Sequence, residues 1–388
     1  MSKNKIIYAA DKNFLEFALV SINSAIVNGN SNYDYYVLHN FEDEKHFKTV
    51  LNNYKNIEYV NLIAVDGSIF EKWKTNATLT SGAYLRLLIP NLFRSSEKVL
   101  YLDCDTLVLD KLDSIFSADV SMKSIAGVLD DKFGKNNSIN GIKNYINSGV
   151  MLMNCKKLSS DNFIEKIRFI YENYEDKIIY HDQCLINFYQ AGNTQLLPNK
   201  FNKMIRAGHI NSGQWIKALE DLPTILHYLG PVKPWMSWSN RSVTAHWLAY
   251  ANLAGFASTS IRKPSTAYEK LLLAKACEND GNHLEASEIK TEIISFLTTF
   301  KNKIMSIGFT AGRLYTITFG DRSHILTCFP PNGEQITIRK TEFPTEVVIG
   351  DEVCSLTFSE NAHDNGWWLK SSQGDCQVTV QDSTGKFL

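Results

Sequence analysis

The first sixty residues alternate between two hydrophobic periods, and this alternation constrains the fold more than any other feature of the chain. Residues Lys5–Ala10 form a short apolar run, which predicts a buried strand, and helical spacing of apolar residues follows up to Gly29. Further strands are predicted at Tyr33–His39 and Ile57–Leu62, with a helix at Asp43–Asn53 between them. This order predicts a mostly parallel sheet with helices on both faces, whose ligands bind at the carboxyl ends of its strands.

The α/β pattern continues to about residue 260, so we expect one domain over residues 1–260. The further predicted strands are Lys98–Leu102, Ile125–Leu129, Val150–Asn154 and Thr224–Tyr228, and the further helices are Asn162–Tyr174, Asp182–Gln190 and Arg241–Ala257.

Two further segments follow this domain. Residues 261–302 contain two predicted helices, Ala267–Glu278 and His283–Phe300, which form a helical hairpin connector. From residue 303 the hydrophobic period changes to two, with turn signals between short runs such as Leu314–Phe319, Glu334–Ile338 and Gln377–Val380. We expect a small all-β accessory domain over residues 303–388.

Charge and cysteine usage exclude several classes of protein. The 388 residues carry 40 Lys and Arg against 41 Asp and Glu, so no sequence-wide basic surface is available for nucleic acid. The N-terminus lacks the apolar run of a signal peptide, and the longest apolar-rich stretch, about Ala245–Ala257, is shorter than the ~20 residues that cross a bilayer. Seven scattered cysteines indicate reduced thiols. We expect a cytoplasmic protein with at most peripheral association at the inner face of the membrane.

The segment Asp103-Cys104-Asp105 is the only Asp-x-Asp in the chain, and apolar runs flank it on both sides. Two carboxylates between apolar runs are costly to bury unless they meet a cation. Hard oxygen ligands at a strand end suit Mn²⁺ or Mg²⁺. A solvated turn is the alternative interpretation.

A second candidate ligand, His227, lies in the segment Leu226–Trp235. A single histidine at a strand end is usually structural, but here Gly230 permits a close backbone approach and Lys233 supplies a point charge suited to phosphate. Two aspartates and a histidine beside a glycine and a lysine indicate a diphosphate site, and the imidazole favours Mn²⁺ over Mg²⁺.

Taken together, these motifs resemble those of the family 8 glycosyltransferases, retaining enzymes with the Rossmann-like GT-A fold. The matching segments, in the order in which the family has them, are Tyr8–Asn13, Ser81–Arg86, Val99–Asp105, Asn147–Val150, His181–Gln183 and His227–Trp235. Residues 261–388 lie outside the resemblance.

The resemblance implies a donor site for a UDP-sugar. The implied donor-binding residues are Asp11, Asn13, Phe14, Arg86, Asp103, Cys104, Gly230 and Lys233. Asp11 and Asn13 are expected to hold the uracil and ribose, with Phe14 stacked on the base, although core packing is equally compatible with Phe14. Gly230 and Lys233 are expected to hold the β-phosphate. Arg86 is expected near the nucleotide and the donor sugar, because a fork of donors suits that task.

The resemblance also implies a metal and a sugar subsite. Asp103, Asp105 and His227 would bind Mn²⁺, or else Mg²⁺, across the diphosphate. The implied catalytic residues that line the donor sugar are Asp130, Asn147, Asp182 and Gln183. An exposed acidic pair with Asp131 is the alternative for Asp130.

The implied reaction moves glucose or galactose from UDP to a glycan acceptor on lipid or protein, with retention of the anomeric configuration. The amide of Gln183 is a poor nucleophile and Asp182 is the nearest carboxylate candidate, so we favour front-face substitution over a covalent intermediate. Two other classes stay open: an inactive carbohydrate- or protein-binding module, and an enzyme that glycosylates its own tyrosines, as glycogenin does.

Overall fold

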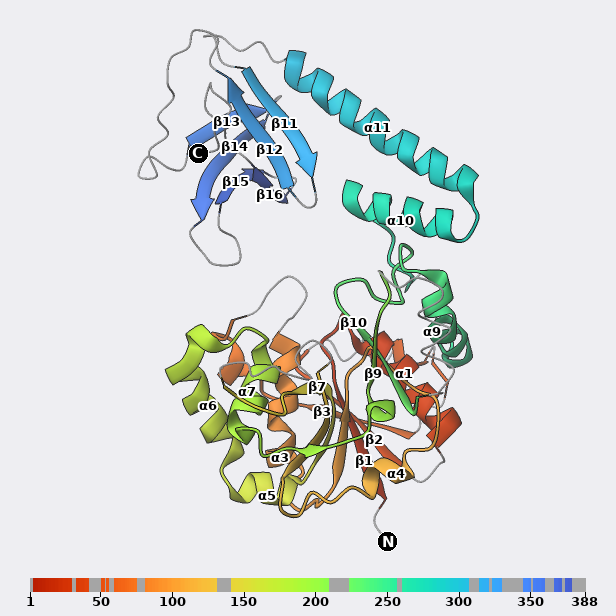
Figure 1. The fold of residues 1–388 in the computed structure, drawn as a ribbon, viewed down its shortest axis with the longest axis vertical. Helices are drawn as coiled ribbons and strands as arrows, with labels where there is room; N and C mark the ends of the chain where they lie inside the picture. The colour runs from red at the N-terminus through yellow and green to blue at the C-terminus, as the bar shows by residue number, and fades with distance from the viewer. Residues whose placement is uncertain are drawn as a thin grey trace. The chain divides into compact units, whose positions relative to one another are not determined.

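The computed structural model describes residues 3–29, 33–41, 50–52, 54–55, 59–74, 81–130, 141–208, 223–256, 260–306, 314–320, 323–329, 345–349, 352–359, 366–371 and 374–378, with side chains up to residue 295. The chain divides into two compact units, Met1–Lys263 and Pro264–Leu388, which are described separately (Figure 1).

A seven-stranded sheet forms the centre of the first unit. Its strands, in spatial order, are β3 (Val60–Ala64), β2 (Tyr33–His39), β1 (Asn4–Ala9), β4 (Val99–Leu102), β7 (Ile146–Met153), β6 (Ile125–Leu129) and β8 (Gln195–Leu196). Strands β3, β2, β1 and β4 pair in parallel, whereas β7 runs antiparallel to both β4 and β6. The sheet is therefore mostly parallel, as the alternating sequence pattern predicts.

Helices cover both faces of this sheet (Figure 1). On one side lie α1 (Leu15–Gly29) and α9 (Arg241–Ala254), and on the other α5 (Cys155–Ser160), α6 (Phe163–Tyr174) and α7 (His181–Gln190). Adjacent residues of β1 pack on opposite faces of the sheet, because side chains alternate along a strand. Ile7 packs in one core cluster with Leu185 of α7, whereas the Tyr8 hydroxyl accepts a hydrogen bond from Ser21 of α1.

Short helical turns complete the connections. They are η2 (Ser68–Phe70), η3 (Ser81–Leu88), α3 (Ile89–Leu92), α4 (Asp113–Phe116), η4 (Glu175–Lys177) and η5 (Asn199–Phe201).

A second, three-stranded sheet lies beside the carboxyl end of β4. Its central strand β10 (Ile225–Leu229) runs antiparallel to β5 (Thr106–Val108) and parallel to β9 (Lys203–Arg206). Because β5 begins just after β4, this small sheet brings residues near position 227 next to those near position 105.

Most predicted elements of the first unit are confirmed. The bounds of β1, β2, β4, β6, β10, α6 and α7 agree with the predicted ranges to within one residue at each end. Strand β7 begins at Ile146 instead of the predicted Val150, because the polar residues Asn147 and Ser148 are buried and satisfied by hydrogen bonds. The predicted helix Asp43–Asn53 lies largely outside the described residues.

The second unit begins with the predicted helical hairpin. Helix α10 (Ala267–Asn279) starts at a capping box, in which Thr266 and Glu269 satisfy each other's backbone N–H groups. Helix α11 (His283–Ser306) extends beyond the predicted end at Phe300. Small side chains fill the space between the helices, where Ala274, Cys277 and Ala286 are buried together. The two helices are also joined by ion pairs, Lys290 with Glu278 and Lys270 with Glu292.

Six strands follow the hairpin and form one sheet. In spatial order they are β11 (Leu314–Gly320), β12 (Ser323–Phe329), β16 (Gly374–Val378), β15 (Gly366–Ser371), β14 (Glu352–Ser359) and β13 (Thr345–Ile349). All pairings are antiparallel except that of β12 with β16. The predicted run Glu334–Ile338 lies outside the described residues.

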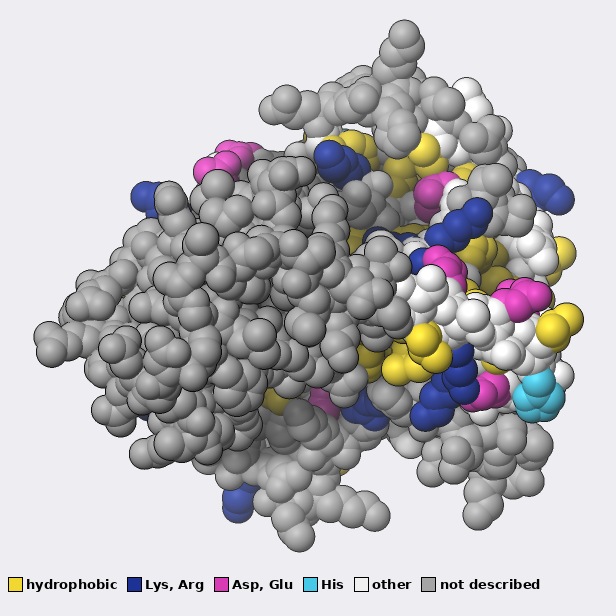
Figure 2. All heavy atoms as spheres, turned by 90° about the horizontal axis from the view of Figure 1, so that it is seen from above, with side chains coloured by type: hydrophobic (Ala, Val, Ile, Leu, Met, Phe, Trp, Pro, Cys, Tyr) yellow, Lys and Arg dark blue, Asp and Glu magenta, His cyan; other side chains and the backbone are white. Residues whose placement is uncertain are grey.

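Charges of opposite sign stand close together on the described surface. On the face shown in Figure 2, the described Lys and Arg side chains are interspersed with Asp and Glu. Among the helices that the structure describes, none combines the length and the apolar composition needed to cross a membrane.

Candidate functional site

The candidate metal ligands lie in β10 and in the turn between β4 and β5, at the carboxyl end of β4. Asp103 follows the carboxyl end of β4, and Asp105 immediately precedes β5. His227 lies in the middle of β10, directly opposite Thr106 of β5. The carboxyl ends of parallel strands are where ligands of such sheets bind. Backbone pairing alone therefore places all three residues together.

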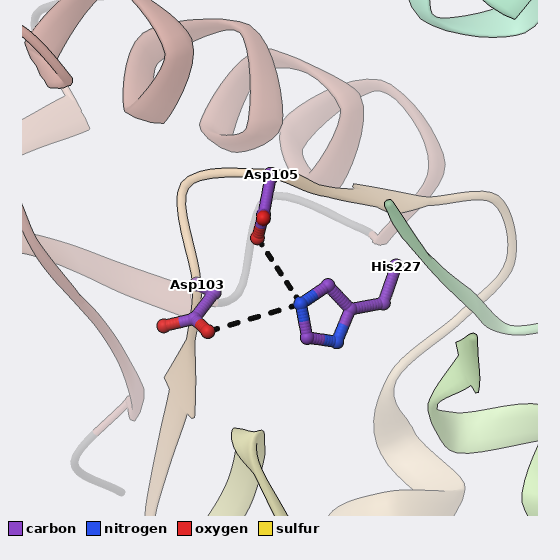
Figure 3. A group of neighbouring side chains, drawn as sticks. All are labelled: Asp103, Asp105 and His227. Atoms are coloured by element: carbon purple, nitrogen blue, oxygen red, sulfur yellow. Dashed lines mark ion pairs between the residues drawn. The ribbon is translucent and has the colours of Figure 1, made fainter. Parts of the chain in front are cut away.

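The side chains of these residues point at a common centre (Figure 3). The Nε2 atom of His227 lies 3.1 Å from Oδ1 of Asp105 and 3.8 Å from Oδ2 of Asp103. One ligand atom from each residue falls within 4.8 Å of the other two, a spacing that one metal ion can span. His227 is almost fully buried, whereas the two aspartates are partly accessible.

Each carboxylate uses its other oxygen to contact the protein. Asp103 Oδ1 accepts hydrogen bonds from the Tyr101 hydroxyl at 2.6 Å and lies 2.9 Å from Nη1 of Arg86. Asp105 Oδ2 accepts a hydrogen bond from Lys233 Nζ at 2.5 Å. The remaining atom, Asp105 Oδ1, is buried and faces His227 Nε2 at 3.1 Å, without a hydrogen bond of good geometry among the described residues. A carboxylate oxygen that faces an imidazole nitrogen in this way fits a cation site.

Gly149 leaves room for the side chains of two candidate ligands. A Cβ atom at this position in β7 would lie 2.2 Å from Cε1 of His227 and 2.7 Å from Oδ2 of Asp103. Any side chain there would clash with both ligands as they are placed. The Gly149 carbonyl also accepts a hydrogen bond from the Asp103 backbone N–H at 2.8 Å, which holds the two strands together at this point.

The surroundings of Asp105 keep its carboxylate ionised, and those of Cys104 keep its thiol protonated. Burial alone would raise the pKa of Asp105, but Lys233 and His227 hold it well below its usual range. Burial, together with the charges of Asp103 and Asp105, raises the pKa of the Cys104 thiol. The Cys104 Sγ faces the Ala9 carbonyl at 3.2 Å. Its side chain therefore faces away from the ligand group.

Arg86 connects the metal-ligand group to Asp182. Its guanidinium contacts Asp103 at 2.9 Å and Asp182 at 3.3 Å, and it lies over the ring of Tyr101. Burial lowers the pKa of Arg86, but the two aspartates raise it overall, so it stays charged. The guanidinium of Arg86, which we expected near the nucleotide and the donor sugar, contacts mainly carboxylates of the protein itself.

The four residues expected to line the donor sugar lie together. Asn147 Nδ2 donates to Gln183 Oε1 at 3.1 Å, and Gln183 Nε2 donates to Asp130 Oδ2 at 3.2 Å. Asp182 accepts a hydrogen bond from the Ser148 hydroxyl, and burial is the main cause that raises its pKa. Asp130 is only 6% exposed, so it is not half of an exposed acidic pair. Asp131 lies outside the described residues.

Asn202 is a site residue that the sequence reasoning missed. It is fully buried between η5 and β9, with its Oδ1 atom 2.9 Å from His227 Nδ1 and its Nδ2 atom 2.9 Å from Asn147 Oδ1. It thereby joins the candidate metal ligands to the candidate sugar subsite. It lies in the one-residue connection between these two short elements, so neither a motif nor a hydrophobic period indicated it.

The remaining candidates lie in two segments, the turn before α1 and the segment that follows β10. Asp11 Oδ1 accepts hydrogen bonds from the backbone N–H groups of Asn13 and Phe14, which fixes the turn before α1. The Phe14 ring is half-buried and edge-on to Trp235, with 6.1 Å between ring centroids. Gly230 follows β10 with φ +85°, in the region that favours glycine. Because β1 and β4 are parallel, Asp11 and Asp103 both follow strands that end at the same edge of the sheet.

Comparisons with known proteins point to one family. The sequence profile of glycosyl transferase family 8 matches residues 5–239. The glycosyltransferase GlyF of Streptococcus pneumoniae is 27% identical over 65% of this chain, and the match covers 62% of GlyF, less than two thirds of its length. The lipopolysaccharide 1,3-galactosyltransferase of Salmonella typhimurium is 23% identical over 78% of this chain and 92% of its own.

A solved structure of the galactosyltransferase LgtC, in complex with donor and acceptor sugar analogues, has the same fold as the first unit. The TM-score is 0.56 at 23% identity, and the match covers 64% of this chain and 96% of that one. The α/β unit therefore has the expected GT-A fold.

Proposed function

The chain belongs to glycosyl transferase family 8, and from this premise we propose that it moves a hexose, glucose or galactose, from UDP to a glycan acceptor with retention of configuration. The observation that carries the proposal is the convergence of Asp103 Oδ2, Asp105 Oδ1 and His227 Nε2 on one centre. Nucleotide-sugar transfer needs positive charge at the leaving diphosphate, and this set of ligand atoms fits a divalent cation.

We assign the cation to Asp103, Asp105 and His227, with Mn²⁺ preferred over Mg²⁺ because one ligand is an imidazole. A bound cation would act as a Lewis acid that stabilises the negative charge on the departing UDP. The protein's own contribution is to keep both carboxylates ionised and oriented through Tyr101 and Lys233.

Lys233 is proposed to assist the leaving group. Its ammonium group donates to Asp105 Oδ2 and to the Tyr228 carbonyl, at 2.5 and 2.8 Å. The group therefore stands beside the proposed cation and can contact the β-phosphate. Gly230, in its left-handed conformation, shapes the turn that leads to Lys233.

The proposed sugar subsite consists of Asp130, Asn147 and Gln183, with Asp182 behind them. Asp182 Oδ2 is engaged by the Ser148 hydroxyl at 3.0 Å and by Arg86 at 3.3 Å. A buried carboxylate held in this way is a poor nucleophile, and the Gln183 amide is a poorer one. These contacts support front-face substitution, in which the acceptor hydroxyl attacks from the side on which UDP departs.

Asp11, Asn13 and Phe14 are proposed to hold the uracil and ribose. They lie at the carboxyl end of β1, which is parallel to the strand that carries Asp103. The exposed Asn13 is available to a ligand, and the half-buried Phe14 offers part of its ring. Cys104 is assigned to this donor site through its position between the two aspartates, and not through its thiol.

The test is UDP release from a panel of UDP-sugars in the presence of Mn²⁺. We expect Asp105→Asn to abolish release without unfolding the protein, since it removes charge from a site and no volume from a core. The matched control is Asp119→Asn, at an exposed loop residue whose carboxylate caps the backbone of Ser121. Undiminished turnover after stripping with EDTA would refute the metal assignment.

The two other classes can be separated from this proposal by experiment. An inactive binding module would release no UDP, and the complete set of Asp103, Asp105, His227 and Lys233 argues against it. Self-glycosylation would raise the intact mass of the protein after incubation with UDP-glucose alone.

For the second unit we propose a role in acceptor choice, with residues 1–260 as the transferase domain, 261–302 as a connector and 303–388 as an accessory domain. A chain shortened to residues 1–302 is expected to keep Mn²⁺-dependent hydrolysis of the UDP-sugar but to transfer poorly to the physiological acceptor. Loss of hydrolysis in a shortened chain that stays folded would contradict this division. The four cysteines whose side chains the structure describes are free thiols, which supports the proposed cytoplasmic location.

A further inference from the structure

Two backbone N–H groups determine which way the buried amides around the site point. The backbone N–H of Gly149 can only donate, and it lies 3.0 Å from one side-chain atom of Asn147, which must therefore be the oxygen. In the same way the N–H of Ser148 identifies Oε1 of Gln183, at 3.1 Å. The NH₂ group of Asn147 donates to that same oxygen, so the two assignments agree. The usual ambiguity between amide nitrogen and oxygen is thereby removed.

The orientation of the Asn147 amide also fixes that of the Asn202 amide, which contacts the candidate metal ligand His227. Because Asn147 presents an oxygen, the Asn202 atom 2.9 Å away must be the nitrogen. The opposite atom of Asn202 is then the oxygen, and it lies 2.9 Å from His227 Nδ1. An amide oxygen can only accept, so Nδ1 carries the proton. In the neutral ring the lone pair is then on Nε2, the nitrogen that faces Asp103 and Asp105.

We propose that Asn202 is a positioning residue that holds His227 in the Nδ1–H tautomer, with its Nε2 lone pair aimed at the cation site. This inference rests on the proposed function, because it assigns Nε2 as the ligand atom. Metal-binding histidines commonly donate their other N–H to a fixed acceptor, which orients the ring and selects the tautomer. Here the acceptor is an amide whose own orientation is set by Gly149 through Asn147.

The fold holds Asn202 firmly enough for this task. It immediately precedes β9, whose first residue, Lys203, pairs with Leu226 of β10. Asn202 is fully buried, and the two described contacts of its side-chain amide are those to His227 and Asn147. A change at Asn202 therefore acts on the metal ligand on one side and on the proposed sugar subsite on the other.

The first experiment measures the tautomer directly in the unmodified, metal-free full chain. Long-range ¹H–¹⁵N NMR spectra of protein labelled at histidine distinguish Nδ1–H from Nε2–H rings, and His227→Gln identifies the signal. Spectra are recorded at about pH 8, above the ordinary pKa of imidazole. We expect Nδ1 of His227 to carry a proton, either alone or together with a second proton on Nε2, which Asp103 and Asp105 would accept in the absence of metal. A ring protonated at Nε2 alone would overturn the proposal whether or not the protein binds metal.

The second experiment measures Mn²⁺ affinity from the EPR signal of free Mn²⁺. Asn202→Leu keeps the size of the side chain but offers no acceptor, and we expect its affinity to fall about 10- to 100-fold. Asn202→Asp keeps an oxygen opposite Nδ1–H and is expected to retain most of the affinity. Wild-type affinity in Asn202→Leu, or an equal loss in both variants, would overturn the proposal.

A matched control separates this effect from the general cost of replacing a buried asparagine. Asn23 in α1 is 2% exposed, and its amide donates to the Lys55 carbonyl, outside the network around His227. Asn23→Leu is expected to lower thermal stability while leaving Mn²⁺ affinity and the His227 tautomer unchanged. If wild-type protein binds no Mn²⁺ at all, the proposed function fails, and the NMR result still decides the role of Asn202.

Discussion

Replacing Gly149 by alanine tests whether Asp103 and His227, in the positions that they hold here, bind the cation. The added Cβ atom would lie 2.2 Å from His227 Cε1 and 2.7 Å from Asp103 Oδ2, both well inside van der Waals contact. Neither neighbour can easily move away. His227 is held by Asn202, and Asp103 is held by Tyr101 and Arg86. The conflict must therefore displace at least one ligand.

The expected effects on stability and on metal binding differ in size. Overpacking in a well-packed region costs about 1–3 kcal/mol of unfolding free energy. The lower backbone entropy of alanine in the unfolded chain offsets about 0.4–1 kcal/mol of this. The net loss of stability is thus modest, whereas Mn²⁺ affinity should fall at least about tenfold, because ligand positions are disturbed.

The assay compares Gly149→Ala with Gly127→Ala, a matched change in the same sheet. A Cβ atom at Gly127 would lie 2.6 Å from Cδ1 of Ile146, the far end of a flexible apolar side chain. Both variants should lose stability in urea unfolding, but only Gly149→Ala should lose Mn²⁺ affinity in EPR titrations. Wild-type Mn²⁺ affinity in Gly149→Ala would refute the assignment of Asp103 and His227 as ligands.

Three further outcomes are expected. Arg86→Met should lower the unfolding free energy of the α/β unit by about 3–5 kcal/mol in urea titrations, because it leaves the carboxylates of Asp103 and Asp182 without the positive charge that compensates them. A change below about 1 kcal/mol would contradict the bridging role of Arg86. Lys233→Ala should lower kcat more than it raises KM, because the β-phosphate gains charge as the sugar bond breaks; an effect on KM alone would assign Lys233 to ground-state binding. Cys104 and Cys155, whose thiol pKa values are raised chiefly by burial, should resist iodoacetamide at about pH 8 in native protein, and rapid labelling seen by mass spectrometry would show that the local structure opens.

Sequence periodicity was sufficient for elements that bury a continuous apolar face. The strand β1 and helices α6 and α7 were predicted to within one residue because their patterns depend on local spacing alone. The start of β7 was missed because Asn147 and Ser148 are polar and yet buried, which only their partners from distant parts of the chain explain. Arg86 was expected near the nucleotide and the donor sugar, which stays a prediction. Its contacts with Asp103 and Asp182 could not be predicted, because they depend on tertiary structure.

The residues of the candidate site also divide into those that the sequence identifies and one that only the structure reveals. Asp103, Asp105, His227 and Lys233 could be selected from residue type, flanking apolar runs and resemblance to the family. Asn202 could not be selected, because a single buried asparagine in the connection before a short strand has no distinctive spacing. Its importance appears only when the direction of each hydrogen bond is followed from Gly149 to His227.

The ligand group joins parts of the chain that are more than a hundred residues apart, since Asp105 lies beside β5 and His227 lies in β10. The group is assembled only after these strands have paired, and such long-range pairing is a slow event in folding. A cation bound there would therefore bind the native chain and not the unfolded one. By mass action, an ion present at 100 times its Kd would add about 2.7 kcal/mol to the unfolding free energy. In a cell depleted of that ion, a smaller fraction of the protein would be folded, and the folded protein would also be less active.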